Sequence, residues 1–370
     1  MELFGRLTDW DATVVAGRRN MHDQSPVLNE GVLITVPVTP YSGNNASRVV
    51  NWGSYSAAAV LRGLTKGRHD VIYGSSPHLG AALAGLIIAR VKRAGFVLEV
   101  RDLWPQILLD AGTMTEDSKI YQGLKKLERF LYEQADAVIV LAKGSADPIV
   151  AEGTDVAKIH FLPNGADPAD FAVDADREQL RARFGFEGTV AIYAGAHGPA
   201  NGLEFALDAA DELSDTDFQM VFVGDGVTKK ELIQKAKDLK LTNVLFLDPV
   251  SKEKIPELFA AADIGLHCLA DIALFHHGVS PNKLYDYMAS GLAVVTNTPG
   301  EVASMVNEAG SGEAVGPTEL ASGIRRIIAM SAQERARLGE AGKKWMKTNR
   351  SRSAMAAQLE ALLDQVVAQQ

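Results

Sequence analysis

The stretch T-V-A-I-Y-A-G-A-H-G-P-A-N-G-L, residues 189–203, contains one complete unit of a parallel α/β fold. Residues 190–195 are apolar without alternation, which is typical of a strand buried on both faces of a sheet. A glycine-rich turn follows and opens a helix at Leu203. This order of strand, turn and helix predicts a doubly wound sheet whose ligands bind at such turns.

The same alternation repeats along the chain. Apolar, β-rich runs occur at residues 12–17, 31–36, 71–74, 96–102, 137–141 and 158–163, and again at 190–195, 219–224, 244–247, 264–268 and 293–297. Helical patterns separate most of these runs, so we expect parallel sheets covered on both faces. Two such series predict an α/β protein with two doubly wound, Rossmann-like domains. The turn-rich stretch 163–168 places the boundary between residues 1–165 and 166–350.

Composition excludes several classes of protein. The 370 residues are 47% hydrophobic and 22% charged, enough for two separate cores. The single cysteine, Cys268, excludes an internal disulfide and fits a reducing compartment. We find no pattern of a signal peptide or a membrane span, and therefore expect a cytoplasmic location. The net charge of −9 falls on the second half, which argues against a nucleic-acid partner.

Three Asp-x-Asp triplets raise the question of a metal-bound diphosphate. The triplets at 9–11 and 215–217 lie in helix-to-strand turns, at the wrong edge of a sheet for ligands. The triplet at 174–176 precedes a helix and is typical of an N-cap. We expect no metal site.

Two strand-to-helix loops carry residues suited to phosphate. The first presents Gly195, His197, Asn201 and Gly202, and its glycines allow a close approach of the backbone to a ligand. The second is Gly224-Asp225-Gly226. In each case a plain tight turn is the alternative, with Asp225 as a local acceptor in the second.

The segment S-P-N-K-L-Y-D-Y-M-A-S-G, residues 280–291, reads as a helix with Ser280 as N-cap, Pro281 in the first position and Gly291 as the stop. Lys283 then lies in the first turn, where the helix dipole disfavours a cation by about 0.3–1 kcal/mol. A bound anion would reverse this effect, and Asp286 on the same face would accept hydroxyl hydrogens of a ribose. The alternative is a surface ion pair between the two side chains.

These motifs resemble a known family. Y-A-G (193–195), N-G-L (201–203), V-G-D-G (223–226), A-A-D (261–263) and P-N-K-L-Y-D-Y-M-A-S-G (281–291) are similar to the donor-binding half of GT-B glycosyltransferases of family 4. V-R-D-L-W-P (100–105) and L-P-N-G-A-D (162–167) resemble a subgroup with fucosaminyl transferases of O-antigen and capsule assembly.

The resemblance covers nearly the whole chain and implies a GT-B fold, with two domains facing each other across a cleft. It implies a retaining hexosyl or N-acetylhexosaminyl transferase that needs no metal or other cofactor. A UDP-sugar donor would bind the C-terminal domain, and a glycan or polyprenyl-linked acceptor would enter from the N-terminal domain. Residues 351–370 are expected to pack back on the N-terminal domain.

The resemblance also adds Val250, Asn282 and the cap residues Ser280 and Pro281 to the donor site. Two departures from the family pattern bear on this site. The second of two family glutamates matches Asp286, but the first falls on Gly278. Where the family commonly has Arg and Lys, the 196–201 loop offers His197 and Asn201, which leaves Lys283 as the cation for the diphosphate.

In the first domain Arg101 and Asp102 end a strand at the cleft edge. Asp102 would orient a hydroxyl group and Arg101 would neutralise phosphate; a buried ion pair that fixes Trp104 is the alternative. His276 and His277 lie next to the expected sugar site and are secondary candidates. Two other functions remain open, a nucleotide-sugar enzyme similar to a 2-epimerase and a non-catalytic partner subunit.

Residues 49–61 are apolar and are followed by Arg62, Lys66 and Arg68. Such a helix either lies in a lipid interface, as a peripheral membrane contact near the acceptor, or packs against the domain core.

At the N-terminus, residues 2–10 read as a helix with Leu3, Phe4, Leu7 and Trp10 on one face. A doubly wound domain should begin with a central strand before this helix. Without it the neighbouring strands must pair directly or leave ladder groups unsatisfied. We therefore expect a chain shortened at its N-terminus, with poor transfer to acceptor.

Overall fold

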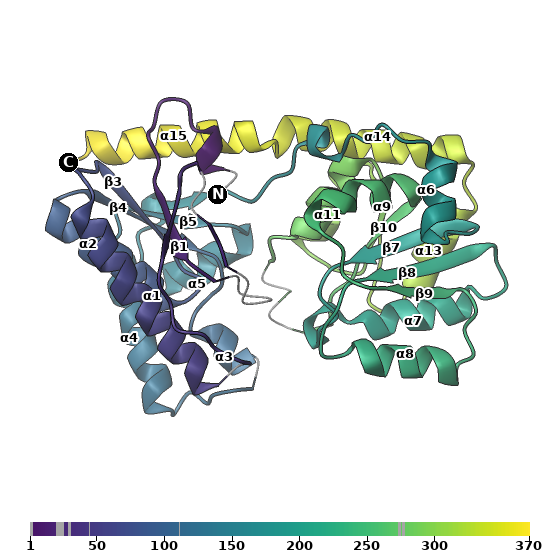
Figure 1. The fold of residues 1–370 in the computed structure, drawn as a ribbon, viewed down its shortest axis with the longest axis horizontal. Helices are drawn as coiled ribbons and strands as arrows, with labels where there is room; N and C mark the ends of the chain where they lie inside the picture. Colours follow the sequence, from purple (N-terminus) through teal and green to yellow (C-terminus); the bar gives the residue numbers. More distant parts are fainter. Residues whose placement is uncertain are drawn as a thin grey trace. The chain divides into compact units, whose positions relative to one another are not determined.

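The computed structural model describes residues 3–19, 26–28, 31–43, 45–110, 112–272, 275 and 278–370. Cα packing divides the chain into two units, Met1–Pro163 with Arg352–Gln370, and Asn164–Ser351. Each unit has parallel sheets flanked by helices (Figure 1), which confirms the predicted α/β class with two Rossmann-like domains. None of the helices in the described part of the chain has the length and apolarity that a bilayer span requires.

The second unit contains one parallel sheet of six strands in the order β12-β11-β10-β7-β8-β9. Its strands are β7 (Thr189–Ala194), β8 (Phe218–Val223), β9 (Val244–Leu247), β10 (Ile264–His267), β11 (Ala293–Thr296) and β12 (Gly312–Ala314). The chain adds strands outward from β7 in one direction and from β10 in the other, so the strand order reverses between these two neighbours. Such a reversal marks the place where doubly wound sheets bind ligands.

Helices cover both faces of this sheet. The helices are α6 (Arg177–Phe184), α7 (Leu203–Glu212), α8 (Lys229–Asp238), α9 (Ile255–Ala261), α11 (Asn282–Ser290), α12 (Glu301–Ala309), α13 (Leu320–Ile328) and α14 (Ala332–Asn349). One core lies under α9, α11, α12 and α14, and includes Tyr287 and Met346; the other lies under α7, α8 and α13, and includes Leu207 and Ile324. Asp176 caps α6 by accepting a hydrogen bond from the Gln179 N–H (3.0 Å), which confirms the predicted cap.

The first unit contains two parallel sheets. Strands β1 (Val14–Gly17) and β2 (Leu33–Val36) form one, and β3 (Val71–Ser75), β4 (Gly95–Val100), β5 (Ala137–Val140) and β6 (Ile159–Phe161) form the other. Its helices are α1 (Ala46–Thr65), α2 (Leu79–Lys92), α3 (Gln106–Asp110), α4 (Lys119–Gln134), α5 (Ala146–Ala151) and α15 (Arg352–Ala368). β1 and β3 do not pair directly. The Tyr55 hydroxyl of α1 instead donates to the Val15 carbonyl of β1 (2.9 Å), on the edge away from β2.

The predicted N-terminal helix is wrong, although its four apolar side chains are partly buried against the same cluster. Only one 3-10 turn forms, Phe4–Arg6, and Leu7 already has extended backbone. Leu3, Phe4, Leu7 and Trp10 pack with α15 on the β3–β6 sheet. The helix ends early because Glu360 of α15 accepts hydrogen bonds from the N–H groups of Thr8 and Asp9.

Glu360 makes the stability of the first unit depend on pH. The backbone N–H groups of Asp9 and Thr8 lower the pKa of its carboxyl group. A lowered pKa in the folded state adds stability above the ordinary glutamate pKa of about 4.3, and this stability is lost as pH falls through the folded-state value. We expect Glu360→Gln to melt below the wild type at neutral pH, with the difference shrinking toward pH 3. Thermal melts of both proteins from pH 7 to pH 3 measure the difference in melting temperature. A difference that stays constant with pH would contradict the role of Glu360.

Candidate functional site

The loops that follow β7 and β10 meet at the strand reversal of the second unit. The Ala270 N–H donates to the Ala200 carbonyl (3.1 Å), and Cys268 Sγ donates to the Gly202 carbonyl (3.1 Å). These contacts join the 195–202 loop to the segment that leads from β10 toward α11. The two loops therefore form one surface at the carboxyl edge of the sheet.

Lys283, in the first turn of α11, reaches across this surface. Its stem lies over Gly195, where an added β-carbon would stand 2.2 Å from Lys283 Cε. Its Nζ lies 3.4 Å from Asn201 Oδ1 and 5.3 Å from the centre of the Tyr193 ring. Burial lowers the pKa of the ammonium group, and the Asp286 carboxylate partly opposes this effect. The structure thus brings three predicted residues, Gly195, Asn201 and Lys283, into contact.

The start of α11 differs from the sequence prediction. The helix begins at Asn282, and Pro281 occupies the cap position without a side-chain hydrogen bond. Ser280 is therefore not the N-cap, because its hydroxyl accepts a hydrogen bond from Asn164 Nδ2 (3.2 Å) instead. Gly291 ends the helix in the left-handed conformation (φ 84°), as predicted. Lys283 is still in the first turn, so the helix dipole disfavours its positive charge as predicted.

Three glycines of the two loops, Gly202, Gly224 and Gly226, face protein backbone. An added β-carbon at Gly224 would stand 2.0 Å from the Gly195 carbonyl oxygen, and one at Gly202 would stand 2.8 Å from the Ala270 backbone. These positions need glycine because the loops pack backbone against backbone. Tight loop packing therefore explains part of the glycine pattern without a ligand.

His197 and Asp225 hold the two loops together. The His197 N–H donates to the Asp225 carbonyl (2.8 Å), and Asp225 Oδ1 accepts from the Gly226 N–H (2.8 Å). The His197 ring is fully buried beside Tyr193 and Phe222, and its nitrogens make no hydrogen bond of ordinary geometry. Burial, then the Lys229 charge, lower its pKa, so the ring is neutral at neutral pH. In this conformation His197 shapes the loops and does not line their surface.

The other predicted donor residues lie around this surface. Asp286 is half-buried one helical turn after Lys283, and Asn282 is exposed at the start of α11, while Pro281 is buried. Val250, in the loop after β9, packs on the core beneath. Two residues were missed by the sequence reasoning: the Tyr193 ring under Lys283, and Lys229, whose Nζ donates to the Gly224 and Leu247 carbonyls (2.7 and 3.1 Å). Tyr193 belongs to the Y-A-G motif, but nothing in the sequence indicates which residue its ring supports.

Arg101 and Asp102 follow β4 in the first unit. Both side chains are exposed, which excludes the alternative of a buried ion pair. Atoms crowded around the Asp102 carboxyl group still raise its pKa, which Arg101 partly opposes. Both residues are at the carboxyl edge of their own sheet, the edge where ligands bind. The secondary candidates His276 and His277 lie outside the described residues.

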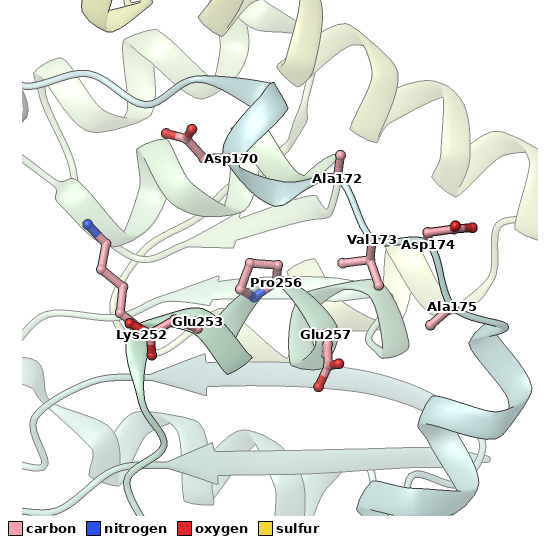
Figure 2. A pocket seen from close by; sticks show the side chains of 9 residues that line it. All are labelled: Asp170, Ala172, Val173, Asp174, Ala175, Lys252, Glu253, Pro256 and Glu257. Atoms are coloured by element: carbon pink, nitrogen blue, oxygen red, sulfur yellow. The ribbon is translucent and has the colours of Figure 1, made fainter. Parts of the chain in front are cut away.

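A separate hollow of about 520 Å³ in the second unit does not suit a diphosphate. It lies between the 170–175 segment and the start of α9 (Figure 2). Its nine lining residues include four carboxylates, from Asp170, Asp174, Glu253 and Glu257, and one cation, Lys252. This excess of negative charge would repel an anionic donor.

Comparison with protein families agrees with the fold. Residues 5–165 match the family described as Glycosyl transferase 4-like domain, and residues 176–345 match the family described as Glycosyl transferases group 1. The chain is therefore built from the two domains of a GT-B glycosyltransferase. Lys283 and the loops around it lie in the second of these domains.

Individual relatives are distant. WcaI of Escherichia coli K12, assigned to colanic acid biosynthesis as a glycosyl transferase, is 26% identical over 266 residues, 70% of this chain and 65% of WcaI. The chain thus aligns with less than two thirds of that relative. Among solved structures, Anabaena HepE in complex with UDP and glucose has a TM-score of 0.69 at 20% identity, covering 90% of this chain and 86% of HepE. WaaG, a glycosyltransferase involved in lipopolysaccharide biosynthesis, has a TM-score of 0.64 at 18% identity, covering 90% and 86%.

Proposed function

We propose that this chain transfers a sugar, with retention of configuration, from a nucleotide-diphosphate donor to a glycan or lipid-linked acceptor in bacterial surface polysaccharide synthesis. The donor is a UDP-sugar, of the fucosaminyl type that the motifs resemble. The names of WcaI and WaaG support a role in polysaccharide synthesis, and the UDP bound to HepE supports uridine as the base of the donor.

One observation carries the proposal: the Lys283 ammonium is held at the strand reversal, in the first turn of α11 and beside Asn201. Three helices begin after loops at this edge, α7, α8 and α11, and the N-terminal N–H groups of a helix attract anions. A half-buried cation beside helix N-termini is unfavourable in the free protein and favourable next to a diphosphate. No carboxylate nucleophile is needed for this arrangement.

The chemistry follows from charge. As the bond between the anomeric carbon and the diphosphate breaks, negative charge develops on the leaving phosphate and the sugar becomes similar to an oxocarbenium ion. Lys283 and the start of α11 stabilise the leaving phosphate. That phosphate takes the proton of the acceptor hydroxyl, which attacks from the same face and gives retention. Asp286 holds the ribose, and Arg101 and Asp102 bind the acceptor.

Calorimetry with UDP tests donor binding, and incubation with a panel of UDP-sugars tests chemistry. We expect UDP to bind and one UDP-sugar to be slowly hydrolysed without acceptor. An epimerised sugar with intact diphosphate would favour the 2-epimerase alternative. Absence of both binding and hydrolysis would favour a non-catalytic subunit.

Asp286→Asn should affect nucleotides selectively. The amide keeps the size of the side chain but loses the charge that accepts ribose hydroxyl hydrogens. We expect UDP to bind about 10-fold or more weakly, the range for a hydrogen bond to a charged group, with pyrophosphate affected much less. Competition of both ligands against a labelled UDP-sugar measures the difference. An equal loss for both ligands would exclude Asp286 as a ribose ligand.

We also propose that the enzyme acts at the cytoplasmic face of the membrane, because a polyprenyl-linked acceptor is confined there. The apolar segment 49–61 and the basic residues that follow it support this location.

A further inference from the structure

The carboxyl ends of β10 and β11 are joined beyond the last residues of the two strands. The regular register of the pair ends at His267 and Thr296. One residue further on, the Asn297 N–H still donates to the His267 carbonyl (3.3 Å). Both segments then continue as loops, and side chains supply the next hydrogen bonds between them.

Asn297 makes two of these hydrogen bonds, both to Leu269. Its Oδ1 accepts from the Leu269 N–H (2.9 Å), and its Nδ2 donates to the Leu269 carbonyl (2.9 Å). Asn297 is 2% exposed, so water hardly competes for these groups. A side-chain amide offers a donor and an acceptor, as a backbone peptide group does. Asn297 therefore pairs with Leu269 as one more strand residue would.

Two threonines and a histidine hold Asn297 in place. Thr298 Oγ1 lies 3.4 Å from Asn297 Oδ1 and 3.3 Å from His267 Nδ1. Thr296 Oγ1 lies 3.0 Å from the same ring nitrogen. These four side chains are at most 4% exposed. Burial, and then the charge of Lys283, lower the His267 pKa to about 3, so the ring is neutral at neutral pH.

Leu269 lies between the two residues that contact the 195–202 loop. Its neighbours Cys268 and Ala270 each donate to a carbonyl of that loop, at 3.1 Å. An added β-carbon at Gly202 would stand 2.8 Å from the Ala270 backbone, so no side chain fits between the two segments there. A shift of Leu269 would therefore move the loop as well.

The part of the loop that would move carries Asn201. The two carbonyls that accept these hydrogen bonds belong to Ala200 and Gly202, on either side of it. Asn201 Oδ1 lies 3.4 Å from Lys283 Nζ. The place of Asn201 beside the ammonium group thus depends on the segment that Asn297 holds.

We propose that Asn297 is a positioning residue for the donor diphosphate: through Leu269 it keeps Asn201 beside Lys283, where the two side chains bind phosphate together. Asn297 acts without touching the donor, because it is buried and its amide is used by Leu269. The proposal deepens the proposed function and rests on it for the identity of the ligand. It requires Asn297 to affect the binding of the diphosphate and not the binding of the nucleoside.

Binding of UDP and of uridine to the full chain, by competition against labelled UDP, tests this role. Asn297→Leu keeps the approximate size of the side chain and removes both hydrogen bonds to Leu269. We expect it to weaken UDP binding about 10-fold or more, in the range for a hydrogen bond to a charged group, and uridine binding less than about twofold. Equal losses for the two ligands would indicate a general loosening of the domain and would overturn the proposal.

Asn297→Asp gives a readout that depends on pH. An ionised carboxylate accepts from the Leu269 N–H but cannot donate to the Leu269 carbonyl, whereas the protonated form does both. Burial raises the pKa of a carboxyl group, so the protonated form should be populated below about pH 6. Relative to the wild type at each pH, UDP affinity should recover at least about threefold from pH 8 to pH 5.5. His267 stays neutral over this range. A ratio that does not change with pH would overturn the proposal.

Asn243→Leu is the matched control. Asn243 Nδ2 also donates to a backbone carbonyl, that of Ala210 (2.8 Å), but Asn243 precedes β9 and lies at the opposite edge of the same sheet. This variant should melt at a lower temperature and bind UDP as the wild type does. A loss of UDP affinity equal to that of Asn297→Leu would overturn the proposal.

A double-mutant cycle tests whether Asn297 acts through Asn201. In an Asn201→Ala background, Asn297→Leu should weaken UDP binding by less than about threefold more, because residues that act through one contact are not additive. Additive losses would overturn the proposal. A wild type that binds no UDP would overturn the proposed function and this inference with it. Wild-type binding of UDP that Asn297→Leu leaves unchanged would overturn this inference alone.

Discussion

Lys283→Ala is expected to weaken the binding of UDP by about 10- to 150-fold in calorimetry. This range corresponds to the 1.5–3 kcal/mol that a charge-assisted hydrogen bond contributes. Lys283 is mostly removed from water, lies against the Tyr193 ring and is held over Gly195. Little order has to be created when a diphosphate arrives, so most of the interaction should appear in the affinity.

The same substitution should leave the unliganded protein equally stable or slightly more stable. Burial lowers the pKa of Lys283, so the folded state disfavours its charged form. With a folded pKa below the unfolded one, the wild type gains stability as pH rises from the folded value toward about 10.4, and the alanine variant lacks this gain. Thermal melts from pH 7 to 10 measure it.

Lys344→Ala, an exposed lysine of α14 in the same unit, controls for the loss of net charge. It should change UDP affinity by less than about twofold at physiological salt, because salt screens the charge of an exposed side chain. Unchanged UDP affinity in Lys283→Ala would remove this lysine from the donor site.

Strands could be predicted from the sequence where burial alone specifies them. Residues 244–247 and 293–296 are short apolar runs that become β9 and β11, because a strand covered on both faces needs no polar alternation. The prediction of an N-terminal helix was wrong because of a contact between residues far apart in the sequence. Its apolar periodicity was real, but Glu360, 352 residues from Thr8, takes the N–H groups that would have continued the helix.

The sequence predicted which loops form the candidate site, but not the contacts between them. Asn201 and Lys283 each follow a parallel strand, and the carboxyl ends of such strands share one edge. Their contact depends on β7 lying next to β10, which no local pattern encodes. The burial of the His197 ring depends on the same packing of loops. The sequence also left open which face of α1 is buried, because hydrogen bonds of Ser54 and Tyr55 to the chain decide it.

Gly195→Ala is expected to weaken UDP binding at least about tenfold, although position 195 offers only backbone to a ligand. Gly195 has φ 152°, a conformation that costs a residue with a side chain about 1–3 kcal/mol, so the protein should also melt at a lower temperature. The new β-carbon would stand 2.2 Å from Lys283 Cε and 3.2 Å from Nζ. The lysine is the flexible partner, so it should move away from Asn201 and from the place where the phosphate binds.

A double-mutant cycle separates this effect from strain. If Gly195→Ala acts by displacing Lys283, then in a Lys283→Ala background it should weaken UDP binding by less than about threefold more, because contacting residues are not additive. Gly310→Ala is the control for backbone strain, since Gly310 has φ 59° and no atom within 4 Å of an added β-carbon. It should lower the melting temperature and leave UDP affinity unchanged. Additive losses of UDP affinity in the cycle would show that Gly195 and Lys283 act independently, and that the glycine serves the packing of the 195–202 loop alone.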